Sequence, residues 1–206
     1  LRSVDFCYDA LRHKGLRRNQ IDFYCFHAPY NKLVQKAFAR LELADNCHEF
    51  GLGPWRASDK YEASLVDKDL DAALRQRVAD AYDAQVRPST LIPARIGNTY
   101  TASVFCGLLS ILATPNLVGK SVLVFSYGSG SLATMYTIRL RQTTNAFFSL
   151  DAIRAVVDVH NRLDSRSSCS LDQFLASCAL REHRYGTSDY EPSGNLPLFP
   201  GVYKLA

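Results

Sequence analysis

A short apolar run that passes through a histidine and a proline into a helical pattern constrains this chain most. It occupies residues 21–40, IDFYCFHAPYNKLVQKAFAR. Residues 21–26 are mostly β-prone and apolar, which predicts a short buried strand. His27 follows that strand directly, and Pro29 suits the first turn of the next helix, where its missing N–H removes no hydrogen bond. Because ligands of open α/β sheets bind just beyond the carboxyl ends of strands, His27 is predicted to lie where a ligand can reach it.

The helix predicted after Pro29 has an apolar face and a basic flank. Its basic residues are spaced four apart, at Lys32, Lys36 and Arg40, so they lie along one side of the helix. Such a row is as common on a solvated surface as at a binding site. Flexible ammonium groups at a helix edge nevertheless suit a phosphate, and Lys32 and Lys36 are therefore candidate ligand-binding residues.

The remaining pattern predicts an α/β fold in a single domain, residues 1–206. β-Rich runs at residues 121–127 and 132–140 are divided by two glycines and predict a hairpin, and residues 91–93 predict a strand fragment. Helical patterns occupy residues 1–18, 67–86, 99–113, 150–163 and 171–184, the last with Ser170 as a candidate N-cap. Residues 45–67 predict a long surface excursion. The helix at 99–113 is apolar nearly all round, so it is expected to be covered on every side.

Composition excludes several classes of protein. Of the 206 residues, 47% are hydrophobic and 21% charged, as in folded soluble proteins, and no apolar run approaches the roughly 20 residues of a membrane span. A net charge of +4, spread along the chain, lacks the dense basic face of a nucleic-acid binder. The six cysteines are scattered without a C-x-x-C pair, which predicts reduced thiols in a cytoplasmic protein without a metal or redox cofactor.

Five residues are candidates for chemistry on a small molecule. His27 can exchange a proton near neutral pH or polarise a carbonyl oxygen. Asn98 and Tyr100 precede the apolar helix, where amide and N–H groups can hold a carbonyl oxygen. Ser126 and Ser129 could add donors from the hairpin. Each has a structural alternative: a packed histidine, an N-cap turn and an ordinary tight turn.

Four segments of the chain resemble the 3-hydroxy-3-methylglutaryl-CoA (HMG-CoA) synthases of the thiolase superfamily. In chain order they are FHAPYNKLVQKAFARL, RIGNTYTASVF, VLVFSYGSGSLATMYTIRL and NRLDSR. The resemblance implies the C-terminal, thiolase-like half of such an enzyme, with a mixed sheet of about five strands layered with helices. An acetoacetyl-CoA-type thioester would then be the substrate.

The resemblance also implies roles for single residues. His27 corresponds to the family histidine that contacts the acetoacetyl group, and Asn98 and Tyr100 join it as catalytic candidates. Lys32 and Lys36 correspond to lysines near the CoA phosphates and pantetheine. Lys32 and Lys36 are therefore substrate-binding candidates, together with two serines of the hairpin, Ser126 and Ser129.

The family's N-terminal half supplies a nucleophilic cysteine and a basic glutamate that this chain does not match. Cys106 lies in the apolar helix, where its thiol would be a poor nucleophile. The first interpretation is therefore a truncated synthase half, catalytic only with an N-terminal half. A second is a free-standing enzyme that uses His27, Asn98 and Tyr100 for non-covalent acid–base chemistry on another small molecule. A third is a non-catalytic partner of a complete synthase.

The apolar helix also predicts a partner. The partner that buries this helix would be a separate N-terminal-half chain or a second copy of this chain. A homodimer is slightly favoured because one kind of chain is present. Neither nucleic acid nor membrane is expected as a partner.

Overall fold

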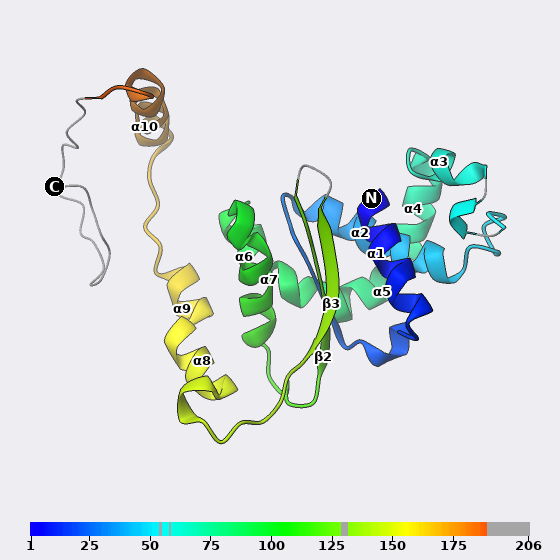
Figure 1. Cartoon of the computed structure of the whole chain (residues 1–206). Helices are drawn as coiled ribbons and strands as arrows, with labels where there is room; N and C mark the ends of the chain where they lie inside the picture. Colours follow the sequence, from blue (N-terminus) through cyan, green and yellow to red (C-terminus); the bar gives the residue numbers. More distant parts are fainter. Residues whose placement is uncertain (54, 58, 129–131, 189–206) are drawn as a thin grey trace. The chain divides into compact units, whose positions relative to one another are not determined.

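The computed structural model describes residues 1–53, 55–57, 59–128 and 132–188. The chain divides into two compact units, Leu1–Ser165 and Arg166–Ala206 (Figure 1). In the second unit the described structure is one helix, α10, Leu171–Arg184, whose first turn is capped by the Ser170 hydroxyl as the sequence predicted. The expectation of a single domain stays a prediction.

A mixed sheet lies at the centre of the first unit. Its described strands are β1 (Phe23–Phe26), β2 (Ser121–Tyr127) and β3 (Ala133–Arg139), in the order β1-β2-β3. β1 and β2 are parallel, whereas β2 and β3 form the predicted antiparallel hairpin. The mixed α/β character is confirmed, but the expected number of about five strands is wrong, because the described sheet has three.

The strand fragment expected at residues 91–93 is also wrong. These residues begin helix α6, Leu91–Ile96, in which Ile92 donates its N–H to the Ser110 hydroxyl at 3.0 Å. A run of three apolar residues is too short for periodicity to separate strand from helix. Pro93 sits in the first turn, where a missing N–H costs nothing.

Helices cover both faces of the sheet. In the first unit they are α1 (Arg2–His13), α2 (Asn31–Asp45), α3 (Lys60–Ser64), α4 (Lys68–Arg77), α5 (Ala79–Ala81), α6, α7 (Ser103–Leu112), α8 (Leu150–Val157) and α9 (Val159–Asp164). Short turns of other helix types are η1 (Arg18–Gln20), η2 (Trp55–Ala57), the π-turn η3 (Tyr82–Val86), η4 (Arg87–Thr90), η5 (Tyr100–Ala102) and η6 (Ala146–Phe148). The helix predicted over 150–163 is two helices, because Asp158 adopts a left-handed φ of 42° between them.

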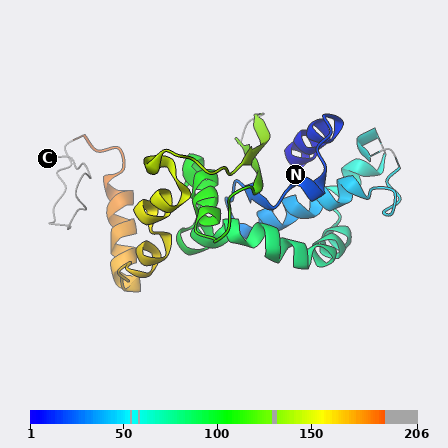
Figure 2. The same cartoon turned by 90° about the horizontal axis from the view of Figure 1, so that it is seen from below.

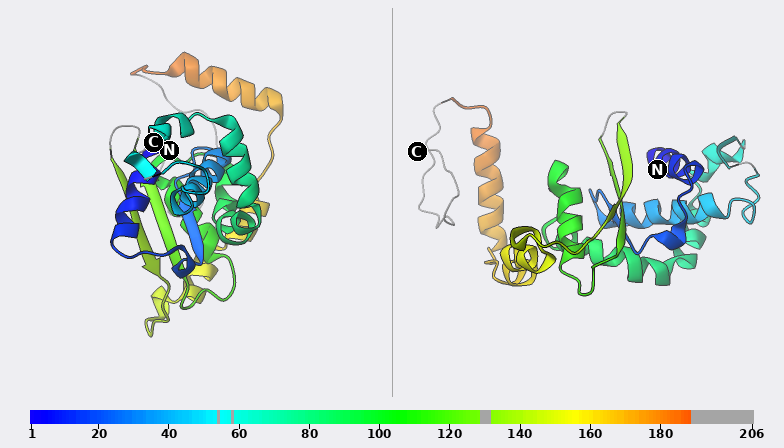
Figure 3. Two further views of the ribbon diagram at one scale, coloured as in Figure 1. Left: turned by 90° about the vertical axis from the view of Figure 1, so that its right-hand side faces the viewer. Right: turned by 60° about the horizontal axis from the view of Figure 1, so that its bottom comes forward.

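Alternation along the strands explains the two layers. Tyr24 and Phe26 face α1 and α2, and the Tyr24 ring meets Phe38 of α2 edge-on, with centroids 4.9 Å apart. Cys25 points to the other face, where its thiol donates to the Val104 carbonyl of α7 at 3.3 Å. Figures 2 and 3 show the sheet between these two groups of helices.

Helix α7 is less covered than its composition predicted. Val104 and Ile111 are buried, and Leu108 is half-buried against the sheet, but 61% of Phe105 is exposed. No described helix has the combination of length and apolar character that crossing a bilayer requires.

Helix α1 is tied to the core by a buried ion pair. Asp5 is 1% exposed and Arg40 of α2 is 4% exposed, and the guanidinium donates to both carboxylate oxygens at 2.7–3.1 Å. The Tyr61 hydroxyl donates to the same carboxylate at 2.9 Å. Arg40 also donates to the carbonyl and hydroxyl of Ser64. This network joins α1, α2 and α3.

Gly107 gives a direct test of the packing between α7 and β1. A Cβ at this position would lie 2.9 Å from the Cys25 sulfur and 3.3 Å from the Ser89 carbonyl oxygen. Gly107→Ala is therefore expected to lower the free energy of unfolding by about 1–3 kcal/mol through overpacking, measured by urea denaturation. Gly128→Ala is the control, because no atom lies within 4 Å of its added Cβ. Equal stability of both variants would show that α7 does not pack this closely.

Candidate functional site

His27 lies at the carboxyl end of β1, as predicted. Its backbone N–H donates to the Phe125 carbonyl of β2 at 2.8 Å, and this hydrogen bond continues the parallel ladder one residue past the strand. Its ring meets the Tyr127 ring edge-on, with centroids 5.4 Å apart. The imidazole is half-buried, and this burial lowers the pKa of His27 from its ordinary 6.5. Near pH 7 the ring is therefore neutral and can either accept or donate a proton.

The parallel register brings Ser126 next to His27. Phe26 pairs with Phe125, so the following residues, His27 and Ser126, lie side by side. By strand alternation Ser126 shares the face of Val124 and Cys25, which is the face covered by α7. The two residues are therefore neighbours in the ladder, whereas the His27 ring contacts Tyr127, which stacks with Phe125 on the cluster at the other face.

The segment that contains Asn98 and Tyr100 leads into the N-terminus of α7. The Asn98 side-chain oxygen accepts the Tyr100 N–H at 2.8 Å, so the structural alternative, a local turn, is present. Tyr100 has a φ of 52°, an unusual backbone conformation for a non-glycine residue, and its side chain is 78% exposed. Three residues on, the buried Ser103 hydroxyl donates to the carbonyl of Ala28 at 3.2 Å. The segment is thereby fixed beside the residue that follows His27.

The two candidate lysines differ in their surroundings. Lys32 is exposed in the first turn of α2, four residues beyond Ala28, and no carboxylate of the described residues pairs with it. Lys36, one turn further, lies 3.6 Å from Asp71 of α4 in an ion pair. Of these two lysines, Lys32 alone has no ion-pair partner among the described residues. Ser129 lies outside the described residues.

Two residues near His27 were missed as candidates. Tyr127 contributes the ring against the imidazole, and burial, aided by Tyr30, raises the pKa of its hydroxyl, which keeps it a proton donor. Ser103 links α7 to Ala28. Both lie in segments that carry the family resemblance, and a tyrosine at the end of a buried strand was the signal for the first.

Two of the cysteines, Cys25 of β1 and Cys106 of α7, lie in the elements next to His27 and to the segment of Asn98 and Tyr100. Burial raises the pKa of the Cys25 thiol to about 12, which makes it an inert core residue. Cys106 lies inside α7, with the Thr99 hydroxyl 3.6 Å from its sulfur. Within the described ranges, no three histidine, cysteine, aspartate or glutamate side chains gather in a way that could hold a metal ion.

The burial of His27 leads to a pH prediction. Because folding lowers its pKa, the protein gains stability from the neutral ring above the unfolded-state value of 6.5, and loses it as the pH falls through the folded-state pKa. An NMR titration is expected to give a His27 midpoint below 6.5. Tyr127→Ala should raise that midpoint, because it exposes the ring to water. A midpoint that does not move would mean that Tyr127 does not shield the imidazole.

Known proteins resemble this chain in sequence and in fold. A family model described as "Hydroxymethylglutaryl-coenzyme A synthase C terminal" matches residues 1–206. Hydroxymethylglutaryl-CoA synthase A of Dictyostelium discoideum is 34% identical over the whole chain, which covers 44% of that protein. The cytoplasmic hydroxymethylglutaryl-CoA synthase of Homo sapiens is 35% identical over 93% of the chain and is covered for 39% of its length.

A solved structure shares the fold. It is described as MvaS in complex with 3-hydroxy-3-methylglutaryl coenzyme A, and it superposes with a TM-score of 0.65 and 25% sequence identity over 94% of this chain and 44% of that one. The chain thus spans less than half the length of the relatives it matches. It belongs to the hydroxymethylglutaryl-CoA synthase family and corresponds to the C-terminal half of those enzymes.

Proposed function

We propose that this chain provides the acetoacetyl-CoA-binding half of an HMG-CoA synthase, and that condensation with acetyl-CoA requires an N-terminal half that supplies a cysteine nucleophile and a glutamate base. The arrangement at His27 carries the proposal. A neutral imidazole at the end of β1 lies beside Ser126, is packed by Tyr127, and is next to the segment that enters α7. A CoA thioester is the substrate in this proposal, and no other cofactor takes part.

The chain's own residues would act on the acceptor ketone. The imidazole N–H of His27 would donate to the ketone oxygen, where negative charge develops during carbon–carbon bond formation. The backbone of His27 is held by the Phe125 carbonyl, so the donor needs little reorganisation when the acyl group arrives. Asn98 and Ser126 would contribute further donors around the acyl group. Lys32 would attract the CoA phosphates.

Exposed side chains at the start of α7 indicate where an N-terminal half would pack. Tyr100 and Phe105 are 78% and 61% exposed at the N-terminal end of α7. We propose that an N-terminal half, or a second copy of the chain, covers them. Sedimentation of the purified chain and of its Phe105→Asp variant distinguishes these two partners. A dimer that dissociates in Phe105→Asp would identify the second copy of the chain as the partner. We propose a cytoplasmic location, because relatives such as the Homo sapiens enzyme are named as cytoplasmic.

Binding of acetoacetyl-CoA to the chain tests the proposal. Lys32→Ala is expected to weaken binding by about 1.5–3 kcal/mol at low salt, because it removes a charge-assisted contact, and by less at high salt. Lys36→Ala is expected to have a smaller effect, since Lys36 is already paired with Asp71. Isothermal titration calorimetry measures the affinity of both variants. The control is Lys68→Ala, at an exposed position of α4.

Two results would contradict the proposal. One is an affinity that Lys32→Ala leaves unchanged at low salt, which would favour a ligand without phosphate. The other is release of CoA from acetyl-CoA and acetoacetyl-CoA by the purified chain alone, which would show that no N-terminal half is needed.

A further inference from the structure

A hollow of about 1180 Å³ lies at the opposite end of α2 from His27. We name it the arginine hollow. It is lined by Phe6, Asp9, Ala10, Arg12, His13, Leu16, Arg17, Arg18, Asn19, Asp45, Arg56 and Ala57. α2 begins at Asn31 and ends at Asp45, and its 15 residues span about 22 Å, so this hollow is separate from the proposed acyl-CoA site.

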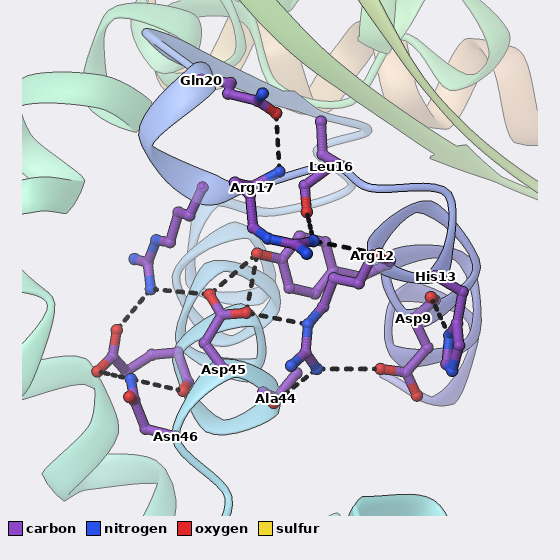
Figure 4. A network of polar contacts seen from close by, with 12 residues as sticks. Asp9, Arg12, His13, Leu16, Arg17, Gln20, Ala44, Asp45 and Asn46 are labelled. Carbon is purple, nitrogen blue, oxygen red and sulfur yellow. Dashed lines mark hydrogen bonds and ion pairs between the residues drawn. The ribbon is translucent and has the colours of Figure 1, made fainter.

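Positive charge exceeds negative charge in the lining. Four arginines contribute guanidinium groups, whereas the carboxylates of the lining come from Asp9 and Asp45, and one of the arginines, Arg18, is paired with Glu42 outside the lining. Both carboxylates hold Arg12, whose Nε lies 3.2 Å from Asp45 and whose Nη1 lies 3.4 Å from Asp9. Asp9 also pairs with Arg56, and Asp45 also accepts the Tyr8 hydroxyl. The Arg12 guanidinium donates to the Ala44 carbonyl at 2.7 Å. Figure 4 shows Arg12 enclosed between the two aspartates, so its position is fixed before any ligand arrives.

Arg17 provides the charge that is not neutralised. Its Nη1 donates to the main-chain carbonyls of Leu16 at 2.9 Å and Arg12 at 3.3 Å (Figure 4). Within the described part of the chain no carboxylate lies within ion-pair distance of it. Carbonyl oxygens hold the guanidinium in place without cancelling its charge, and its remaining N–H groups can donate to an anion.

Arg56 adds a second guanidinium group to the lining of the hollow. Its guanidinium lies over the Phe6 ring, 3.3 Å from the centroid, which orients the side chain. Its Nη1 forms an ion pair with Asp9 Oδ2 at 3.6 Å, the same separation as between Lys36 and Asp71, so Asp9 partly offsets its charge. Both guanidinium groups line the same hollow, Arg17 without an ion-pair partner among the described residues, and planar guanidinium forks match phosphate oxygens.

We propose that the arginine hollow binds a small molecule carrying a diphosphate group, held by Arg17 and Arg56. The excess positive charge favours a multiply charged anion over a monovalent one. Arg12 also lines the hollow, where the two aspartates hold its guanidinium in place. The proposal does not depend on the reaction at His27.

Titration with inorganic pyrophosphate tests the proposal on the full chain. Binding at low ionic strength is expected, and Arg17→Gln should weaken it about tenfold or more, because one charge-assisted donor set is lost. Raising the salt concentration should weaken binding to the unchanged protein. The matched control is Lys14→Gln, which removes an exposed positive charge three residues away that does not line the hollow.

Two further variants make the outcome decisive. Asn19→Asp adds a negative charge to the lining without disturbing the bonds of Arg17, so it should weaken binding even if Arg17→Gln fails to fold. Lys32→Ala tests whether the anion binds instead at the proposed CoA site. An absence of pyrophosphate binding at low ionic strength overturns the proposal. Equal losses of affinity in Arg17→Gln and Lys14→Gln also overturn it. So does a loss of affinity in Lys32→Ala that Arg17→Gln and Asn19→Asp do not share. The last result would assign the anion to the other site.

Discussion

Replacing His27 with alanine is expected to slow condensation by about 100- to 10,000-fold in a protein that joins this chain to an N-terminal synthase half, because the imidazole would be the proton donor to the acceptor ketone. The fold should survive, since His27 is half-buried at the end of a strand and its backbone hydrogen bond to Phe125 does not involve the side chain. The N-terminal half of the Dictyostelium discoideum relative, placed before Leu1, provides the test protein.

The assay measures CoA release from acetyl-CoA and acetoacetyl-CoA at saturating substrate, and circular dichroism checks that the variant is folded. His48→Ala is the matched control, because this exposed histidine lies far along the chain from the sheet edge. A folded His27→Ala variant that turns over at the normal rate would assign His27 a purely structural role. In that case the second interpretation from sequence, acid–base chemistry through His27 on another molecule, would fail with it.

Asp5→Ala is expected to lower the free energy of unfolding by about 3–5 kcal/mol, the largest stability effect that the structure suggests. The change leaves the Arg40 guanidinium buried at 4% exposure without its carboxylate, and an uncompensated buried charge is costly. It also removes the acceptor of the Tyr61 hydroxyl. Urea denaturation measures the effect as a lower midpoint with an unchanged slope.

Two controls separate the buried charge from the loss of packing. Arg2→Ala breaks the ion pair with Glu62, whose side chains are both more than 60% exposed, and should cost less than about 1 kcal/mol. A double variant, Asp5→Leu with Arg40→Met, should recover much of the lost stability because neither charge remains. If Asp5→Ala cost no more than Arg2→Ala, the network would not anchor α1.

The strand, the histidine and the hairpin could be predicted because each has a local signal. The β-prone run at residues 21–26 was confirmed as β1, and the glycine-divided runs were confirmed as β2 and β3. Ser170 begins α10 because its hydroxyl accepts the N–H of Gln173. These features depend on residues within a few positions of each other, so the sequence alone determines them.

The features that could not be predicted depend on distant contacts. Whether residues 91–96 form a strand or a helix is decided by packing on α7, where Ser110 accepts the N–H of Ile92. The expectation of about five strands came from the resemblance and not from runs in the chain. Tyr127 was not singled out because its contact with His27 depends on which strand lies beside β1.

The parallel pairing of β1 with β2 also determines when the chain can fold. Asp22 and Ser121, joined by a hydrogen bond at the start of the two strands, are 99 residues apart in sequence. The hairpin of β2 and β3 is local and can form within microseconds, but β1 must close this long loop before it gains a partner. At 5–20 residues per second, a ribosome needs about 5–20 s to make the intervening segment. A nascent chain therefore carries the apolar strand β1, with its histidine, unpaired for that interval, and the hairpin serves as the late template that completes the sheet.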